Sequence, residues 1–320
     1  INKPNEEIIQ KFVEITEIEN RRYLEDDEFN SDLGFRAAKE AIYDAKINQE
    51  DLDYIIYASN FGEVDKNGMT NFMPSMSARV KNKLGIKNRN CVNYDMIFGC
   101  PGWVEAMILA DTLIKAKKAK LILVVGSETL SRVTDAFDRN KMIFADGAGA
   151  VVVQATDDEN VGIIADCTIC DNDVELNYLE NAPSLKQDED RRPLYIRMHG
   201  RKIYEYALKN VPDAIKQTID KAGLTIDDID KILIHQANAK MDYAMISRLF
   251  KLYGKKDYDH AIAPMTIQQF GNSSVATIPT MFDLIIKGEM KDQSFADKGN
   301  IVFASVGAGM NINAIVYRFP

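Results

Sequence analysis

Residues 98–116 read FGCPGWVEAMILADTLIKA, and residues 270–288 read FGNSSVATIPTMFDLIIKG. Both stretches begin with Phe-Gly and continue into a largely apolar run with helical spacing. The two copies are 172 residues apart, since 270 − 98 = 172. A single match of this kind carries little weight, so the interpretation depends on whether other segments repeat in the same order.

Two further pairs of segments repeat in that order. Residues 48–60, NQEDLDYIIYASN, match residues 225–237, TIDDIDKILIHQA, and each copy follows an amphipathic helical pattern. LILVVGSE from Leu121 matches IVFASVGAG from Ile301, and apolar runs of this kind are typical of strands buried on both faces. We therefore predict two duplicated α/β halves packed about a pseudo-two-fold axis. The helices that follow the two Phe-Gly pairs should lie between the sheets.

The composition is that of a globular protein and argues against several functional classes. Of the 320 residues, 46% are hydrophobic and 27% are charged, which disfavours disordered and fibrous chains. No apolar run reaches the roughly 18–20 residues of a membrane-spanning helix, and the polar first residues do not resemble a signal peptide. The net charge of −9 lacks the basic balance that nucleic-acid binding requires. We expect neither a membrane nor a nucleic-acid partner.

Cysteine usage indicates a reducing compartment. The four cysteines are too sparse for a disulfide scaffold, so we expect a cytoplasmic protein. Cys167 and Cys170 form a C-x-x-C, but they lie in a strand-like stretch with no second Cys or His pair nearby. We interpret this pair as structural and expect no metal site.

Cys100 is the first candidate for chemistry. It follows a strand-like stretch and opens a helix, and Pro101 suits the first helical turn. The positive end of a helix dipole favours a thiolate, so this position predicts a lowered thiol pKa and a nucleophile. The alternative is a buried structural cysteine, which is the commoner fate of a free thiol.

His235 and Asn272 are the second and third candidates. His235 ends an apolar strand and precedes Gln-Ala-Asn, which would place it facing a cavity, although a core histidine is the alternative. Asn272 occupies in the second copy the place of Cys100 in the first, so a pseudo-two-fold axis would bring the two helix starts together. Asn is also a preferred helix N-cap and can serve in both ways.

The chain resembles the β-ketoacyl-[acyl-carrier-protein] synthase III family. The resemblance implies the thiolase fold, a five-layer αβαβα sandwich of two halves, residues 1–155 with the nucleophile and residues 156–320 with the His and Asn. It also implies that the Gly-rich DGAGA at 146–150 is a structural turn, and that a strand and a turn precede Ile1. The supporting motifs are DMIFGCPGW at 95–103, GSETLSR at 126–132, DRNKMIFADGAGAVV at 138–152, HQAN at 235–238, FGNSSVATIP at 270–279 and SVGAGM at 305–310.

The resemblance implies a ping-pong condensation without metal or organic cofactor. Cys100 would accept an acyl group from acyl-CoA, and decarboxylation of malonyl-[acyl-carrier-protein] would supply the enolate that attacks it, as in the initiation of fatty acid synthesis. His235 and the Asn272 amide would stabilise the enolate oxygen. The backbone N–H groups of Cys100 and Ala308 would form the oxyanion hole.

The resemblance also implies a homodimer, in which the loop at 60–76 reaches the neighbouring subunit and offers Phe72, Met73 and Met76 to the acyl pocket. Carrier-protein docking would use basic residues after HQAN, since carrier proteins are acidic, although a solvated helix face is the alternative. The docking candidates are Lys240 and Arg248, within a cluster that includes Lys251, Lys255 and Lys256. The substrate-binding candidates are Met73, Phe144, His199, Gly200, Asn238 and Arg139.

Departures from the family pattern leave the acyl donor open. Lys11 and Ile15 stand where the family clamps the CoA adenine with an aromatic residue and Arg, which points to another donor such as acyl-[acyl-carrier-protein]. FGCPGW replaces the commoner AACSGF, so a secondary-pathway synthase of the dialkylresorcinol type, using longer or β-ketoacyl donors, is one alternative. A second is a condensation without malonyl, for which the only loop base is Glu63. A third is a non-catalytic partner subunit, which the intact Cys, His and Asn disfavour.

Overall fold

The computed structural model describes residues 4–186 and 194–320 and contains two four-stranded sheets. The first sheet has the order β4-β1-β5-β6 and the second the order β10-β11-β12-β7. The strands of the first sheet are β1 (Tyr54–Ala58), β4 (Val92–Met96), β5 (Leu121–Thr129) and β6 (Asp146–Gln154). Those of the second are β7 (Gly162–Cys170), β10 (Lys231–Ile234), β11 (Asn300–Gly307) and β12 (Asn311–Arg318).

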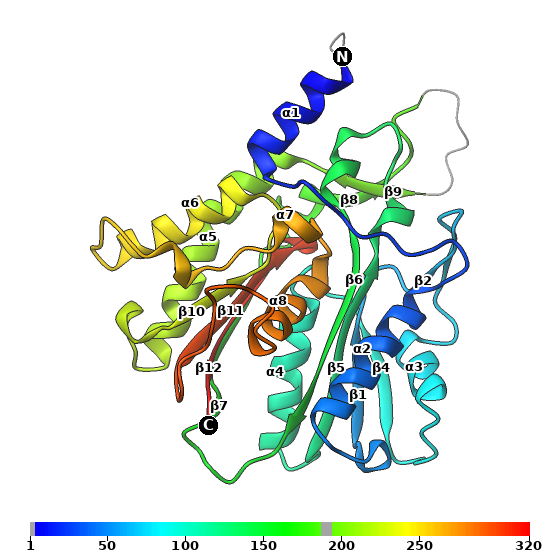
Figure 1. Cartoon of the computed structure of the whole chain (residues 1–320), viewed down its shortest axis with the longest axis vertical. Coiled ribbons are helices and arrows are strands. Elements are labelled where there is room, and N and C mark those ends of the chain that lie inside the picture. Colours follow the sequence, from blue (N-terminus) through cyan, green and yellow to red (C-terminus); the bar gives the residue numbers. More distant parts are fainter. Residues whose placement is uncertain (1–3, 187–193) are drawn as a thin grey trace.

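Helices cover both faces of both sheets and form five layers (Figure 1). The central layer holds α4 (Gly102–Lys115) and α8 (Thr277–Ile286). Outside the first sheet lie α2 (Asn30–Asp44) and α3 (Met76–Leu84), and outside the second lie α5 (Gly200–Lys221) and α6 (Ala239–Leu252). This arrangement confirms the predicted αβαβα sandwich. The division of the chain at residue 155, which falls between β6 and β7, stays a prediction.

The two sheets share one pairing scheme. β1 pairs parallel with β5 as β10 does with β11, and β5 pairs antiparallel with β6 as β11 does with β12. The schemes differ at one edge, because β7 pairs with the outer edge of β12. Within residues 4–186 and 194–320, no strand pairs with the corresponding edge of β6.

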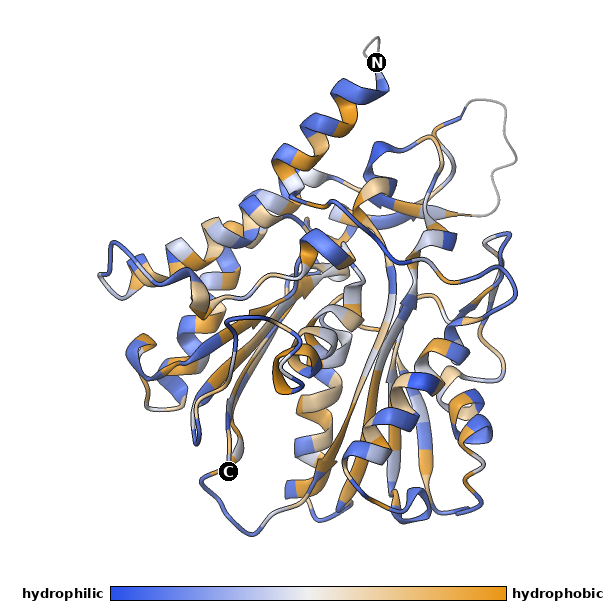
Figure 2. Cartoon of the chain, in the orientation of Figure 1, coloured by the Kyte–Doolittle hydropathy of each residue, from blue (hydrophilic) through white to orange (hydrophobic). Residues whose placement is uncertain are grey.

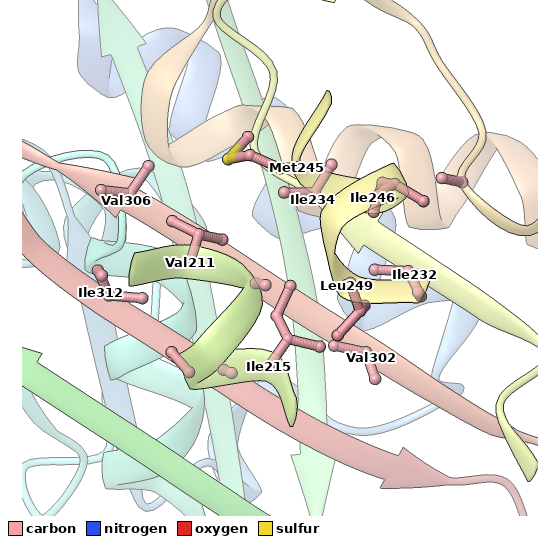
Figure 3. Packing of buried hydrophobic residues seen from close by; sticks show 14 of the residues in the cluster. Val211, Ile215, Ile232, Ile234, Met245, Ile246, Leu249, Val302, Val306 and Ile312 are labelled. Atoms are coloured by element: carbon pink, nitrogen blue, oxygen red, sulfur yellow. The ribbon is translucent and has the colours of Figure 1, made fainter. Parts of the chain in front are cut away.

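The core follows from the continuous apolar runs of the central strands. All nine residues of β5 are buried, and seven of the eight residues of β11 are buried. Figure 2 shows hydrophobic residues concentrated along the strands, whereas the outer helices alternate between hydrophobic and hydrophilic residues. Figure 3 shows how α5 and α6 pack onto the second sheet through Val211, Ile215, Ile232, Ile234, Met245, Ile246, Leu249, Val302, Val306 and Ile312.

The central helix α8 packs unusually close to the first sheet because two glycines of β6 leave room for it. A Cβ at Gly149 would come within 2.7 Å of the Pro279 side chain, and one at Gly147 within 3.2 Å of the Ser273 side chain. The DGAGA stretch is therefore the beginning of strand β6, and its prediction as a turn was wrong. Its glycines serve helix–sheet packing rather than a change of chain direction.

Short elements complete the fold at the end where the two sheets meet. They are α1 (Asn5–Thr16), the hairpin β2 (Glu63–Val64) and β3 (Thr70–Asn71), the hairpin β8 (Leu179–Ala182) and β9 (Tyr195–Met198), and α7 (Ile267–Phe270). The composition of residues 184–193, SLKQDEDRRP, predicts a surface loop, but this stretch lies mostly outside the described residues. Among the described helices, none is long and apolar enough to span a bilayer.

Cys167 and Cys170 are both on β7, opposite Ala314 and Asn311 of β12. Residues three apart on a strand point to opposite faces, so these two thiols do not face each other. In the described part of the chain, no group of three or more His, Cys, Asp or Glu side chains is arranged to hold a metal ion.

Candidate active site

A cavity of about 330 Å³ opens at Cys100. Its wall combines residues from both halves, so the site exists only when the two sheets are packed together. Its lining is mainly apolar, with a few amide, hydroxyl and carboxyl groups. The lining residues are Asn60, Phe61, Ile97, Phe98, Gly99, Cys100, Leu130, Phe144, Leu179, Glu180, Asn181, Ile196, Ser274, Ala308, Gly309 and Asn311.

Cys100 lies between β4 and the start of α4, as its sequence position predicted. Pro101 is the N-cap and Gly102 is the first helical residue, one position later than expected. The turn is closed by the Gly102 N–H, which donates to the Gly99 carbonyl at 3.1 Å. Gly99 has φ 70°, a left-handed conformation that glycine adopts without strain. The thiol is thus presented to the cavity at the N-terminus of a 14-residue helix.

Two glycines bring the backbone of the SVGAGM segment against Cys100. A Cβ at Gly307 would lie 2.4 Å from the Cys100 nitrogen, and one at Gly99 would lie 2.7 Å from the Ala308 nitrogen. The Ala308 peptide is held by Asn311, whose Nδ2 donates to the Ala308 carbonyl at 3.0 Å. The backbone segments around Cys100 and Ala308 are therefore packed closely together, and both residues line the cavity.

The electrostatic environment of the thiol differs from the prediction. Desolvation raises the pKa of Cys100 to about 11, and the Ser274 hydroxyl opposes this shift. Helix position was expected to lower the pKa, but the apolar cavity wall contributes the larger effect. Burial therefore favours the neutral thiol over the thiolate.

Asn272 occupies the corresponding turn of the second half, where Gly271 also has a positive φ, of 62°. Its backbone bridges the two halves, because the Ala145 N–H donates to the Asn272 carbonyl at 2.8 Å and the Asn272 N–H donates to the Ile143 carbonyl at 2.9 Å. The Ser274 N–H donates to Asn272 Oδ1 at 2.8 Å. That bond fixes the amide so that its Nδ2 is the group left to donate to a ligand.

His235 follows β10 directly and is almost completely buried. The backbone N–H of His235 donates to the Ala304 carbonyl at 2.8 Å, which continues the pairing of β10 with β11 by one residue. Desolvation lowers the pKa of His235 to about 4, while hydrogen bonding with the Ser274 backbone opposes the shift. The imidazole is therefore neutral at physiological pH, and Nδ1 is buried without a hydrogen-bond partner.

Ser274 is the residue that links the three predicted groups. It lines the cavity with Cys100, acts on the thiol through its hydroxyl, and contacts His235 and Asn272 through its backbone. Its own backbone is left-handed, with φ 53°, a conformation that is uncommon outside glycine and is concentrated at functional sites. His235 and Asn272 do not line the cavity themselves, and they reach it through Ser274.

Comparisons with known proteins identify the family of the chain. Residues 94–172 match the family model 3-oxoacyl-[acyl-carrier-protein] synthase III, and residues 219–319 match the model of its C-terminal part. The β-ketoacyl-[acyl-carrier-protein] synthase III of Erythrobacter litoralis is 32% identical over 312 residues, covering 96% of this chain and 89% of that protein. The chain belongs to the 3-oxoacyl-[acyl-carrier-protein] synthase III family.

Solved structures of this synthase III family share the fold over nearly the whole chain. The Thermus thermophilus β-ketoacyl-[acyl-carrier-protein] synthase III superposes with a TM-score of 0.82 at 28% identity, covering 97% of this chain and 90% of that one. The priming β-ketosynthase of the R1128 polyketide biosynthetic pathway has a TM-score of 0.82 at 25% identity, covering 99% of this chain and 89% of that one. Members of the family are acyl-transferring condensing enzymes, and this chain is an acyltransferase of that type.

Among the candidates from the synthase III resemblance, Phe144 is placed in the cavity wall. Met73 is 83% exposed at the end of the β2–β3 hairpin and does not line the cavity of its own chain. Met76 is 1% exposed in the core beneath α3, so its prediction as a pocket residue was wrong. The burial of Met76 follows from its position as the first residue of that helix, facing the first sheet.

The remaining candidates lie outside the cavity wall. His199 and Gly200 are exposed at the start of α5, and His199 Nε2 is 3.9 Å from Oε1 of the wall residue Glu180. Asn238 caps α6, because its side chain accepts from the Met241 N–H at 3.2 Å. The basic candidates Arg139, Lys240 and Arg248 are exposed to solvent.

Part of the cavity wall has no signal in the sequence. Leu179, Glu180 and Ile196 come from the β8–β9 hairpin, which lies in no quoted motif. Other wall residues lie in quoted segments but were not selected. Among these are Asn60, which ends the repeat 48–60, Leu130 in GSETLSR and Ser274 in FGNSSVATIP, where the Cys100–Asn272 correspondence drew attention to the neighbouring Asn272.

Proposed function

We propose that this chain catalyses decarboxylative condensation of an acyl thioester with malonyl-[acyl-carrier-protein], giving a β-ketoacyl-[acyl-carrier-protein] at the initiation of fatty acid synthesis. The observation that carries the proposal is that Cys100, at the start of α4, lines the same cavity as Ala308, whose backbone packs against the Cys100 turn. Acyl transfer needs a nucleophile with N–H donors beside it, and we assign the donor role to the Cys100 and Ala308 N–H groups.

In the first half-reaction, Cys100 Sγ attacks the thioester carbonyl of the donor. The carbon–sulfur bond to the donor breaks, and the thiol proton ends on the departing thiol, so no oxidant or cofactor is consumed. Because burial raises the pKa of the Cys100 thiol, the thiolate needs stabilisation from the site, and the Ser274 hydroxyl favours it. The Cys100 and Ala308 N–H groups then stabilise the negative charge that develops on the carbonyl oxygen.

In the second half-reaction, malonyl-[acyl-carrier-protein] loses CO2 and the resulting enolate carbon attacks the acyl-Cys100 carbonyl. The enolate oxygen needs donors that are present before the charge develops. We assign this role to Asn272 Nδ2 and the single N–H of neutral His235, although neither residue is among those that line the cavity. The Asn272 amide is oriented by Ser274, and the His235 pKa is lowered to about 4. The carbon–sulfur bond to Cys100 breaks, and Cys100 leaves as a thiolate that takes one proton from solvent.

The cavity size bears on the acyl group. A volume of about 330 Å³ lies at the lower end of the range for small-molecule sites, which favours a short or medium acyl chain. The donor carrier is CoA or an acyl carrier protein. A second candidate is a secondary-pathway ketosynthase of the dialkylresorcinol type, and the polar wall residues Asn60, Glu180 and Asn181 favour an oxygenated acyl group for it.

The two remaining alternatives, a condensation without malonyl and a non-catalytic partner subunit, fit the geometry less well. A condensation without malonyl would use Glu63 as base, but Glu63 does not line the cavity and accepts hydrogen bonds from the Ser31 N–H at 2.9 Å and the Ser31 hydroxyl at 2.7 Å. A non-catalytic partner subunit would not need the linked arrangement of Cys100, Ser274 and Asn272.

The proposal includes a cytoplasmic homodimer that needs no metal or organic cofactor. Support for the dimer comes from apolar side chains left exposed beside the edge strand β4. Phe72 is 54% exposed, Met73 is 83% exposed and Ile97 is 63% exposed. Lys240 and Arg248 on α6 are the proposed docking residues for an acyl carrier protein.

Intact-mass measurement tests the central claim. The protein is mixed with acyl-CoA and acyl-[acyl-carrier-protein] donors of increasing chain length, and we expect a covalent acyl adduct that Cys100→Ala abolishes. Cys170→Ala, which removes an exposed thiol on β7, is the matched control and should retain the adduct. Absence of any adduct on the wild-type chain, or an adduct that persists in Cys100→Ala, contradicts the proposal.

A further inference from the structure

Glu128 is a completely buried carboxyl group that the proposed mechanism does not use. It lies near the end of β5, and its Oε1 accepts two hydrogen bonds from Asn60, one from the backbone N–H at 2.7 Å and one from Nδ2 at 2.7 Å. Its Oε2 accepts a third from the Ser59 hydroxyl at 3.4 Å. Glu128 thus holds Asn60 at two points, by its main chain and its side chain.

Asn60 connects this carboxyl group to the nucleophile. Its Nδ2 also donates to the Ser274 hydroxyl at 3.4 Å, and both residues line the cavity beside Cys100. The Ser274 hydroxyl in turn favours the Cys100 thiolate. A continuous chain of side chains therefore runs from Glu128 through Asn60 and Ser274 to Cys100, across the junction of the two halves.

We infer that Glu128 is a positioning residue for the nucleophile, holding Asn60 so that the Ser274 hydroxyl stays directed at Cys100. The inference rests on the proposed role of Cys100 as the acyl acceptor. The position of the Ser274 hydroxyl matters because the apolar cavity wall excludes water from the thiol. In such an environment, each hydrogen bond stabilises a developing thiolate more strongly than it would in water.

The charge on Glu128 has a second, opposing effect. Desolvation raises the pKa of Glu128 to about 8, and the nearby Asp146 of β6 acts in the same direction. A charged Glu128 raises the pKa of Cys100, whereas the hydroxyl that it positions lowers it. The neutral His235 is the other titratable group that contacts Ser274. Geometry and charge can therefore be separated by substitution.

The test is the rate of Cys100 alkylation by iodoacetamide, followed by intact mass between pH 7 and 10, with Cys100→Ala to subtract the other thiols. Glu128→Ala removes both the charge and the hydrogen bonds, and we expect alkylation at a given pH to slow by roughly fivefold to tenfold, which corresponds to the loss of one typical intramolecular hydrogen bond. Glu128→Gln keeps an oxygen for both Asn60 donors and removes the charge, so we expect a rate equal to or above that of the wild type.

Two further variants keep the test decisive if Glu128→Ala does not fold. Asn60→Ala breaks the link while leaving Glu128 in place and should slow alkylation in the same way, with no additional effect in a Ser274→Ala background. Glu63→Gln, at a buried carboxyl group of the neighbouring loop that does not touch Asn60, is the matched control and should leave the profile unchanged.

An unchanged pH profile in folded Asn60→Ala overturns the inference, as does an equal slowing by Glu128→Gln and Glu128→Ala. Acyl uptake by the wild-type chain is measured separately from alkylation. If the proposed function is wrong, the wild-type chain takes up no acyl group. If only the role of Glu128 is wrong, the wild-type chain takes up the acyl group, and the alkylation profiles of the Glu128 and Asn60 variants are identical to that of the wild type.

Discussion

Gly307 lies so close to Cys100 that a Cβ on it would come within 2.4 Å of the Cys100 nitrogen. The same Cβ would lie 2.7 Å from Cδ of Pro101. The last residue of β11 and the residue before α4 therefore share a space that admits no side chain. The two halves are thus in close backbone contact at the point where the proposed chemistry occurs.

Gly307→Ala tests whether this contact shapes the oxyanion hole. We expect acyl uptake to fall by about a hundredfold, the effect of losing one oxyanion donor, and stability to fall by about 1–3 kcal/mol from overpacking. The measurements are intact mass after mixing with acyl donor and urea unfolding. Gly162→Ala, at φ 86° in open space on β7, is the control that should lose stability through backbone strain while keeping acyl uptake. Retained uptake in Gly307→Ala would contradict the assignment of the hole.

His235→Ala and Asn272→Ala separate the two half-reactions. Each removes a proposed donor to the enolate oxygen, so malonyl decarboxylation should fall by about a hundredfold or more while acyl transfer to Cys100 changes little. The measurements are CO2 release from malonyl-[acyl-carrier-protein] and acyl adduct formation on the same samples. If acyl transfer is lost in parallel with decarboxylation, the two side chains act in the first step instead.

The buried imidazole of His235 makes stability depend on pH. Because its pKa is lowered to about 4 in the folded chain against about 6.5 when unfolded, the unfolded chain binds a proton in that interval that the folded chain does not. The stability that the neutral imidazole contributes is complete above pH 6.5 and is lost as the pH falls toward 4. At pH 5 the loss amounts to about 2 kcal/mol. Urea unfolding at pH 7 and pH 5 should show a smaller loss for His235→Gln than for the wild type. His260→Gln, at an exposed histidine, should behave as the wild type.

Charge reversal on α6 tests carrier-protein docking. Lys240→Glu and Arg248→Glu should raise the KM for malonyl-[acyl-carrier-protein] by roughly threefold to tenfold while leaving acyl uptake from CoA donors unchanged, because rim charges act mainly on association. The effect should shrink at high salt. Lys118→Glu, at an exposed lysine after α4, is the control. An equal effect of all three variants would mean that net charge, not a docking surface, is responsible.

The repeat predicted the fold well because it reports directly on buried structure. Two Phe-Gly stretches 172 residues apart predicted that α4 and α8 share the central layer, and the apolar runs predicted strands covered on both faces. The position of Cys100 before a helix also followed from the sequence. The prediction for DGAGA was wrong because two glycines close together indicate a turn locally. The glycines are instead needed because Pro279 packs against Gly149 and Ser273 against Gly147. These partners are 130 and 126 residues away in the sequence, so no local pattern contains them.

The electrostatics of the site were the least predictable part. A helix start indicates a lowered thiol pKa, but the actual environment of Cys100 depends on wall residues such as Leu179 and Ile196, brought from a different hairpin. The motif GSETLSR contains Glu128 but predicts no role for it, and its partner Asn60 is 68 residues away in the sequence. Burial and long-range partners are properties of the packed fold, so composition and periodicity carry little information about them.

The open edge of β6 has a practical consequence for work with this chain. Its counterpart β12 is paired with β7, whereas no described strand pairs with the outer edge of β6. A strand edge of this kind can accept an extended segment. A peptide that repeats the side-chain alternation of β7 is therefore expected to add to β6 as β7 adds to β12.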